Sequence, residues 1–324
     1  MGMDALCAPA VVGQLVAKPV EHYAGLVEIR KRSAQAMRLV DYVRVYATTH
    51  QLVAETHRQY EVTAERIDAW AGQPVMLSDL NELLVSGWLR DYAAQGWKPA
   101  TVRSKRTQLM ALWRAAADEY LCDPPTRRVR SARVPWEPRE CWTLDEVNQL
   151  LRAARRLRRS PGGGMPRAEW FDLAIRVAWD SGLRWGDQIA LRTESLYGSV
   201  VMVAQSKTRR PVCARLSAST MAALSESLRR YPRSHVTPWS ASHETFNAQV
   251  RRLVARAGIR PGTWKWLRRG SATDVEIQQP GKGMAARHLG HAPGSRVAEI
   301  NYLSPAVIAQ HIPIVSPREL TSGA

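Results

Sequence analysis

Apolar residues recur at three- and four-residue intervals along most of this chain, which is the spacing of helices that bury one face. The clearest case is 101–120, where Leu109, Leu112, Trp113 and Ala116 form one apolar stripe. The same spacing predicts further helices in the first third of the chain, at 38–56, 60–70 and 78–95. We therefore expect a small helical domain over residues 33–122. The preceding N-terminal arm, residues 1–32, shows no clear pattern and is assigned no structure.

A proline-rich segment follows this helical part. Residues 123–139 contain four prolines, which forbid a continuous helix and favour an extended chain. The segment is also basic, with Arg127, Arg128 and Arg130 near its centre. It predicts a basic linker that joins two domains and contacts a phosphate backbone.

After the linker, helical segments flank one pair of short strands. Thr143 is a typical helix N-cap, and acidic residues follow it in the first turn. Residues 199–217 predict two strands joined by a polar turn at Lys207–Arg210. Further helices are expected at 217–230, 243–257, 264–277, 282–290 and 296–311. The chain should thus be mainly α with a small antiparallel β-sheet, with a second domain over 140–314 and a C-terminal tail at 315–324.

The net charge narrows the choice of partner. A charge of +17 attracts polyanions, because protein cations that neutralise phosphates release condensed counterions. Nucleic acid is therefore the first expectation, and a membrane surface is the second. No apolar run has the length of a membrane span, and the N-terminal residues lack the basic start and apolar core of a secretory signal.

Other protein classes are excluded by what the motifs lack. The four cysteines are scattered without the spacing of a zinc site or a disulfide framework. They predict reduced thiols, no metal site and a cytoplasmic location. The sequence has no GxxxxGK[ST] phosphate loop, which argues against an NTPase.

The start of the 101–120 helix is a candidate DNA-binding element. Its first turns carry Thr101, Arg103, Lys105 and Arg106 beside the apolar stripe. A helix with a buried stripe and a basic, hydroxyl-rich start suits docking on a phosphate backbone or in a groove. A solvated helix end is the alternative interpretation, and the segment alone does not decide between them.

The stretch SGLRWGDQIALR, 181–192, is the first candidate for chemistry. An apolar helical pattern leads into it, and Gly182 stands where a helix C-terminus needs a left-handed residue. Arg184 then lies on a tight connection between two packed helices, from which it can point into a cleft. The alternative is a surface arginine paired locally with Asp187.

Further candidates follow along the chain. Lys207, at the tip of the predicted hairpin, can reach a phosphate or protonate a leaving oxygen, or it is simply solvated. Its neighbours Arg209 and Arg210 extend the basic surface. Lys265 and Arg268 share one helix face at a spacing of i and i+3. A Leu-Gly pair precedes His291, and Tyr302 follows it by eleven positions; each of these is ambiguous by itself.

Taken together, the order Arg184, Lys207, Lys265-x-x-Arg268, Leu-Gly-His291 and Tyr302 resembles the tyrosine recombinase, or phage integrase, family. SGLRWGD looks like its first arginine box, QSKT like its hairpin lysine, and LGH with a following tyrosine like its last box. The resemblance covers about residues 33–313. It implies a helical core-binding domain and an α+β catalytic domain that form a C-shaped clamp on DNA.

The resemblance also implies a reaction. Tyr302 would attack the scissile phosphate and form a 3′-phosphotyrosine link, without metal or ATP, because the covalent step preserves the phosphodiester energy. Arg184 and Arg268 would bind the nonbridging oxygens, and Lys207 would protonate the departing 5′ oxygen. The implied roles of the remaining residues are donation to the phosphate by Lys265, donation or proton transfer by His291, and bracing of the site by Asp187.

The family further implies double-stranded DNA as the partner and a homotetramer on paired recombination sites, formed from monomers in free solution. A bacterial or phage-encoded, nucleoid-associated protein fits this expectation. The apolar residues after Tyr302, among them Val307, Ile308, Ile312 and Ile314, would pack on a neighbouring protomer or on their own domain.

Two departures from the family pattern leave alternatives open. Lys265 stands where the family commonly has histidine, and the interval from His291 to Tyr302 is about two residues longer than usual. The alternatives are a catalytically impaired DNA-binding protein on the same scaffold and strand relaxation of the type IB topoisomerase kind.

Overall fold

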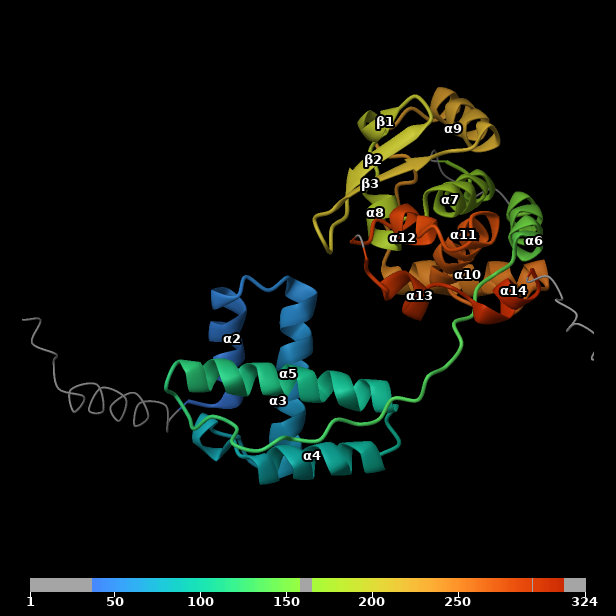
Figure 1. Ribbon diagram of the computed structural model, residues 1–324. Coiled ribbons are helices and arrows are strands. Elements are labelled where there is room, and N and C mark those ends of the chain that lie inside the picture. The colour runs from blue at the N-terminus through green and yellow to red at the C-terminus, as the bar shows by residue number, and fades with distance from the viewer. Residues whose placement is uncertain (1–36, 158–164, 293, 312–324) are drawn as a thin grey trace, which may run out of the picture. The chain divides into compact units, whose positions relative to one another are not determined.

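The computed structural model describes residues 37–157, 165–292 and 294–311. The chain divides into two compact units, Met1–Trp136 and Glu137–Ala324 (Figure 1). The N-terminal arm predicted for residues 1–32 and the tail predicted for 315–324 lie outside the described residues. In the described part of the chain, no helix combines the length and apolar character needed to cross a membrane.

The first unit is built from helices. They are α2 (Leu39–Thr49), α3 (Ala54–Ala71), α4 (Glu82–Ala94) and α5 (Pro99–Asp118), with the short helix η1 (Leu77–Asp79) before α4. The single helix expected over 38–56 is wrong, since α2 ends at Thr49 and α3 begins at Ala54. Between them Gln51 has a φ of 48°, and a left-handed residue cannot continue a right-handed helix.

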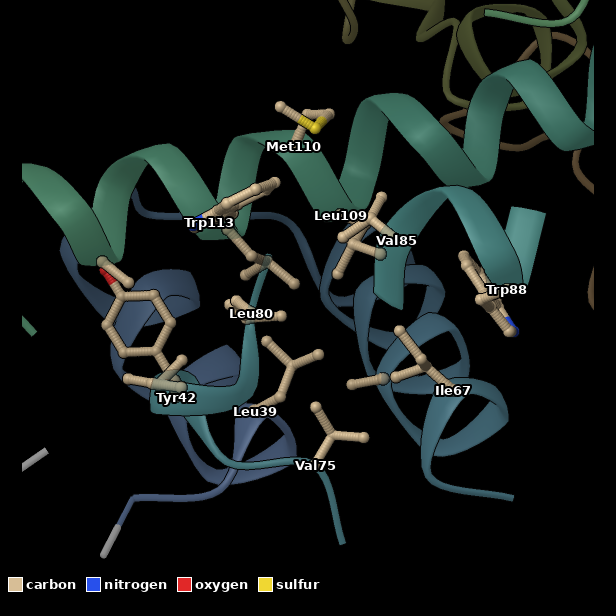
Figure 2. Close-up of a cluster of buried hydrophobic side chains, with 14 of the residues drawn as sticks. Leu39, Tyr42, Ile67, Val75, Leu80, Val85, Trp88, Leu109, Met110 and Trp113 are labelled. Atoms are coloured by element: carbon tan, nitrogen blue, oxygen red, sulfur yellow. The ribbon is translucent and has the colours of Figure 1, made fainter. Parts of the chain in front are cut away.

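The apolar stripes of these helices meet in one core (Figure 2). Leu39 and Ile67, from α2 and α3, are fully buried against Leu109 and Trp113 of α5. The polar tips of two core aromatics are satisfied, because Tyr42 Oη donates to Glu119 at 2.8 Å and Trp113 Nε1 donates to the Asp123 carbonyl at 2.8 Å. This core holds the basic start of α5 in place.

The proline-rich segment is partly fixed on the first unit and runs beside α4 and α5 (Figure 1). Glu82 Oε1 accepts the backbone N–H groups of Thr126 and Arg127 at 2.6 and 2.8 Å. Arg106 donates to the Val129 carbonyl through Nε and Nη2, at 2.9 and 2.7 Å, and the Val129 side chain is buried. Residues 126–129 therefore do not behave as a free linker.

The second unit is mostly helical as well. Its elements are α6 (Leu144–Arg155), α7 (Arg167–Ser181), α8 (Trp185–Ile189), η2 (Thr193–Ser195), α9 (Ala218–Arg230), α10 (His243–Ala257), α11 (Lys265–Gln278), α12 (Met284–His288), α13 (Val297–Asn301) and α14 (Pro305–Ala309). As predicted, Thr143 caps α6, and its side chain accepts the N–H of Glu146. The mainly helical fold with a small antiparallel sheet is thereby confirmed.

The sheet has the order β1–β2–β3 and is antiparallel throughout. Strands β2 (Val200–Ala204) and β3 (Pro211–Arg215) form the predicted hairpin, with Met202 opposite Cys213, and the short β1 (Leu196–Tyr197) adds to its edge. Val201 and Val212 point inward, to a core shared with α7. This packing fixes the turn that carries Lys207.

The last predicted helix, 296–311, is wrong as a single element. The chain forms α13, breaks after Asn301, and begins α14 at Pro305. The break is held by the N–H of Ser304, which donates to Thr273 Oγ1 of α11 at 3.1 Å. Of the expected apolar tail, Val307 is buried, whereas Ile312 and Ile314 lie outside the described residues.

Candidate active site

Arg184 lies at the joint between α7 and α8. Gly182 ends α7 with a φ of +57°, and a Cβ there would lie 2.6 Å from Nε2 of His288. Glycine is therefore required both by the left-handed turn and by the close approach of α12. The turn brings Arg184 to the N-terminus of α8 with its side chain 24% exposed.

Arg268, one turn into α11, is buried with 4% exposure. Its Nη1 donates to the carbonyl of Gly182, and its Nη2 donates to the carbonyl of Leu289 at 3.1 Å. Burial lowers the pKa of the guanidinium to about 10, so it is still charged at neutral pH. Its Nε has no hydrogen-bond partner among the described residues, which leaves a buried donor for an incoming anion.

Tyr302 follows α13 directly and is 8% exposed. The guanidinium carbon of Arg268 lies 4.9 Å from the centre of its ring, and Nζ of Lys265 lies 5.6 Å from it. Burial raises the pKa of the phenol, but the positive charge of Arg268 and a hydrogen bond with its side chain, followed by the charges of Arg184 and Lys265, outweigh burial and set the pKa below its usual value. A lowered pKa favours the phenolate, which is the form of a tyrosine that acts as a nucleophile.

Lys265 is the residue that departs from the family pattern. Burial lowers the pKa of its ammonium, and the charges of Arg269 and Arg139 add to the effect. A lysine with a depressed pKa donates a proton more readily than a solvated one. The position therefore keeps a hydrogen-bond donor next to the tyrosine ring.

His291 also lies next to Tyr302, with the ring centres 5.3 Å apart. Burial, followed by the charges of Arg268 and Arg184, lowers the pKa of the imidazole to about 4. The side chain is therefore neutral at pH 7 in the free protein. Within the described residues, neither ring nitrogen has a hydrogen-bond partner.

Asp187 contacts both Arg184 and the turn that carries Lys207. The carboxylate is buried, and its Oδ1 accepts the backbone N–H of Ser206 at 2.8 Å and the Ser206 hydroxyl at 2.7 Å. Arg184 Nη1 is 3.8 Å from its Oδ2. Asp187 therefore ties α8 to the β2–β3 turn, next to Lys207, and contributes negative charge near Arg184.

One cavity of about 500 Å³ unites most of these groups. Its lining includes Arg184, Lys207, Lys265, Arg268 and Tyr302. Lys207 is exposed on the β2–β3 turn and also lines this cavity. The structure thus gathers residues that are far apart in sequence around a space able to hold a phosphate group.

Gln205 is a residue of this site that sequence reasoning misses. Its buried side chain accepts Arg184 Nη1 on Oε1 at 2.6 Å and donates through Nε2 to the Leu289 carbonyl at 2.8 Å. The strand alternation carries the signal, because Val201, Val203 and Gln205 point to the same side. A polar residue at an inward position predicts a buried hydrogen-bond partner.

The residues expected to bind DNA fall into two groups. Lys105 is 5% exposed, and its Nζ donates to Thr63 Oγ1 at 2.8 Å; it is part of the buried stripe, between Val102 and Leu109. The prediction that Lys105 lies on the basic surface is therefore wrong. Arg106 is committed to Val129, and Thr101 is half-buried. The exposed members are Arg103, Arg127, Arg128, Arg130, Arg209 and Arg210.

This chain resembles known proteins in its three-dimensional structure. No family model and no curated protein matches the sequence. The fold resembles that of a lambda integrase dimer bound to a COC′ core site, with a TM-score of 0.61 and 20% identity over 91% of this chain and 81% of that one. A lambda integrase tetramer bound to a Holliday junction gives 0.61 and 21% identity over 86% and 82%.

A second recombinase shows the same likeness. The XerH site-specific recombinase bound to difH substrate, in a pre-cleavage complex, matches with a TM-score of 0.58 and 16% identity over 75% of each chain. The helical first unit and the helical second unit with its small sheet are both found in the expected order. The chain therefore has the fold of the tyrosine recombinases, the family that its motifs resemble.

Proposed function

We propose that this protein is a site-specific DNA recombinase, or integrase, which cuts and rejoins DNA through a 3′-phosphotyrosine intermediate on Tyr302. The observation that carries the proposal is the shared cavity in which a phenol of lowered pKa lies beside Arg268, Lys265 and Arg184. A group of cations around one nucleophile suits attack on a phosphodiester.

In the proposed step, Tyr302 Oη forms a bond to phosphorus while the bond from phosphorus to the 5′ oxygen breaks. The phenol proton passes to the neutral imidazole of His291, whose pKa rises once the phosphate is bound. Lys207 gives a proton to the departing 5′ oxygen. The link keeps the energy of the phosphodiester, so rejoining needs no nucleotide cofactor.

The transition state carries negative charge on the nonbridging oxygens, and the cations of the cavity stabilise it. Arg184 and Arg268 present planar donors that bind such oxygens bidentately, and Lys265 adds a third donor. The unpartnered Nε of Arg268 gains a partner when a phosphate enters. This gain favours phosphate binding, and it favours the transition state as far as the bond strengthens with the added negative charge.

Double-stranded DNA is the proposed substrate, held by the exposed arginines of both units. The proposed assembly is a homotetramer on paired sites, which rests on the likeness to a lambda integrase tetramer bound to a Holliday junction. In free solution we expect monomers.

The test is covalent capture. A pool of random-sequence duplexes carries a nick just downstream of possible cleavage positions, so that the short cut fragment diffuses away and cannot be rejoined. Wild-type protein should form a denaturant-resistant protein–DNA adduct, without ATP and with a chelator present. Sequencing of the captured DNA gives the site, and peptide mapping should find it attached to Tyr302.

Two variants make the test specific. Tyr302→Phe should form no adduct while still binding DNA, whereas Tyr197→Phe, at an exposed strand position, should behave as wild type. An undiminished adduct with Tyr302→Phe, or none with wild type, would refute the proposal; the latter result would favour a DNA-binding protein without catalysis. Relaxation of supercoiled plasmids without sequence preference would favour the topoisomerase alternative.

A further inference from the structure

Gln205 lies between the two arginines of the candidate site. Its Oε1 accepts Arg184 Nη1 at 2.6 Å, and its Nε2 donates to the Leu289 carbonyl at 2.8 Å. The same carbonyl accepts Arg268 Nη2 at 3.1 Å. Arg184, Gln205, the Leu289 carbonyl and Arg268 are thus consecutive members of one hydrogen-bonded chain, and the Gln205 side chain in its middle is fully buried.

This connection addresses a physical problem of the site. Two guanidinium groups close together repel each other, and the charge of Arg184 is one of the causes that lower the pKa of Arg268. Asp187 offers limited help, because its Oδ1 is committed to Ser206 and its Oδ2 is 3.8 Å from Arg184. A short hydrogen bond to a buried amide can fix Arg184 without cancelling the charge that a phosphate requires.

We propose that Gln205 is a positioning residue for DNA cleavage, and the idea rests on the function proposed above. It holds Arg184 at a set place relative to Arg268, so that both guanidiniums meet the nonbridging oxygens of one phosphate. Gly290 makes this possible, since a Cβ there would lie 2.9 Å from Gln205 Nε2.

Gln205 also touches the turn that carries Lys207, and a test must separate the two routes. Thr208 Oγ1 donates to Gln205 Oε1 at 2.9 Å, and the Gln205 backbone accepts the N–H of Arg209 at 2.8 Å. The proposal is that the side chain acts through Arg184. A route through Lys207 is the competing outcome.

Modified DNA distinguishes these routes. A methylphosphonate at the cleavage position lacks one negatively charged oxygen and so needs Arg184 less. A sulfur in place of the 5′ bridging oxygen leaves without a proton and so needs Lys207 less. The substrates are nicked duplexes of the sequence captured by wild-type protein, and the readout is the single-turnover rate of adduct formation.

Gln205→Met, which keeps the length of the side chain but neither polar atom, should cleave ordinary DNA about 10- to 100-fold more slowly, the effect of losing a hydrogen bond to a charged group. On the methylphosphonate substrate, Gln205→Met should regain most of the lost cleavage rate, as Arg184→Ala should. On the sulfur substrate it should regain none. Thr208→Val, which leaves the bond between Gln205 and Arg184 in place, should stay within about twofold of wild type.

A second measurement is independent of activity. In full-length protein labelled with ¹⁵N-arginine, the Arg184 guanidinium signal, assigned from its loss in Arg184→Lys, should show hindered rotation in wild type and free rotation in Gln205→Met. Should Gln205→Met fail to fold, the smaller Gln205→Ala replaces it. This variant also lacks the acceptor for Arg184 Nη1, so rotation of the Arg184 guanidinium should again become free.

The outcomes separate cleanly. A wild-type cleavage rate for Gln205→Met, recovery on the sulfur substrate instead of the methylphosphonate, or an Arg184 signal that does not respond to Gln205 would each overturn the inference. If wild-type protein forms no adduct while the signal responds as expected, the proposed function fails and the contact between Gln205 and Arg184 stands.

Discussion

Replacement of Gly290 by alanine should lower the stability of the second unit and disturb the candidate active site. Gly290 has a φ of +65°, and a Cβ there would lie 2.2 Å from Cγ2 of Val212 and 2.9 Å from Nε2 of Gln205. Alanine in the left-handed region costs about 1–2 kcal/mol, and overpacking of a filled core costs a further ~1–3 kcal/mol. The free energy of unfolding of the second unit should therefore fall by about 2–5 kcal/mol.

A matched control separates the two contributions. Gly258 ends α10 with a φ of +67°, and a Cβ added there would have no neighbouring atom within 4 Å. Gly258→Ala should therefore lose only the backbone part, about 1–2 kcal/mol. Urea unfolding of both full-length variants, followed by tryptophan fluorescence, measures the difference. In a Val212→Ala background, Gly290→Ala should become less costly, since the methyl group that it strikes is gone.

The same variant should also lose cleavage. Gly290 follows the Leu289 carbonyl that Gln205 and Arg268 share, so a shift of the backbone there moves both partners. Adduct formation under conditions where the variant is folded reports this effect. The reasoning is refuted if Gly290→Ala is no less stable than Gly258→Ala, or if its cost is unchanged by Val212→Ala.

Other parts of the chain give independent predictions. DNA binding should weaken steeply with salt. The slope of log K against log salt should decrease by about one unit in Arg103→Ala but not in Lys105→Met, because the Arg103 side chain is exposed and that of Lys105 is buried. Equal slopes for the two variants would contradict this placement of the side chains. Arg106→Ala removes both donors to the Val129 carbonyl and should lower the stability of the first unit by about 1–3 kcal/mol, measured by urea unfolding. His288 and His291 each have a pKa of about 4 against an ordinary 6.5, chiefly because burial disfavours their charge. The unfolded chain therefore takes up protons first, and stability should fall between about pH 6.5 and 4. His288→Asn should remove roughly half of that dependence in thermal unfolding, because the share of His291 remains.

The order of chemical motifs could be predicted from the sequence, because each rests on a local rule. Gly182 ends a helix, Arg184 follows on a tight joint, and Lys207 lies in a polar turn between two strands. Such rules also predicted the helical class and the antiparallel hairpin, which the structure confirms. That these groups surround one cavity was expected only by resemblance, since no local pattern brings residues so distant in sequence together.

The failures share a cause as well. Lys105 was assigned by its charge, although its spacing from Val102 and Leu109 places it in the apolar stripe, where Thr63 and Gln108 satisfy its ammonium. Gln205 has no role in the sequence analysis, where it appears only within the motif QSKT. In both cases the periodicity of the element indicates a buried position, and residue type alone does not.

The anchor between Ser304 and Thr273 has a consequence for how this site tolerates change. Two residues after Tyr302, the Ser304 N–H donates to Thr273 Oγ1 of α11 at 3.1 Å and fixes the chain next to that helix. Lys265 and Arg268 lie on the same helix. This contact therefore helps to keep the phenol near those cations independently of the chain length between His291 and α13. Length variation in that interval is a neutral kind of change for such a scaffold, whereas loss of the threonine hydroxyl would not be.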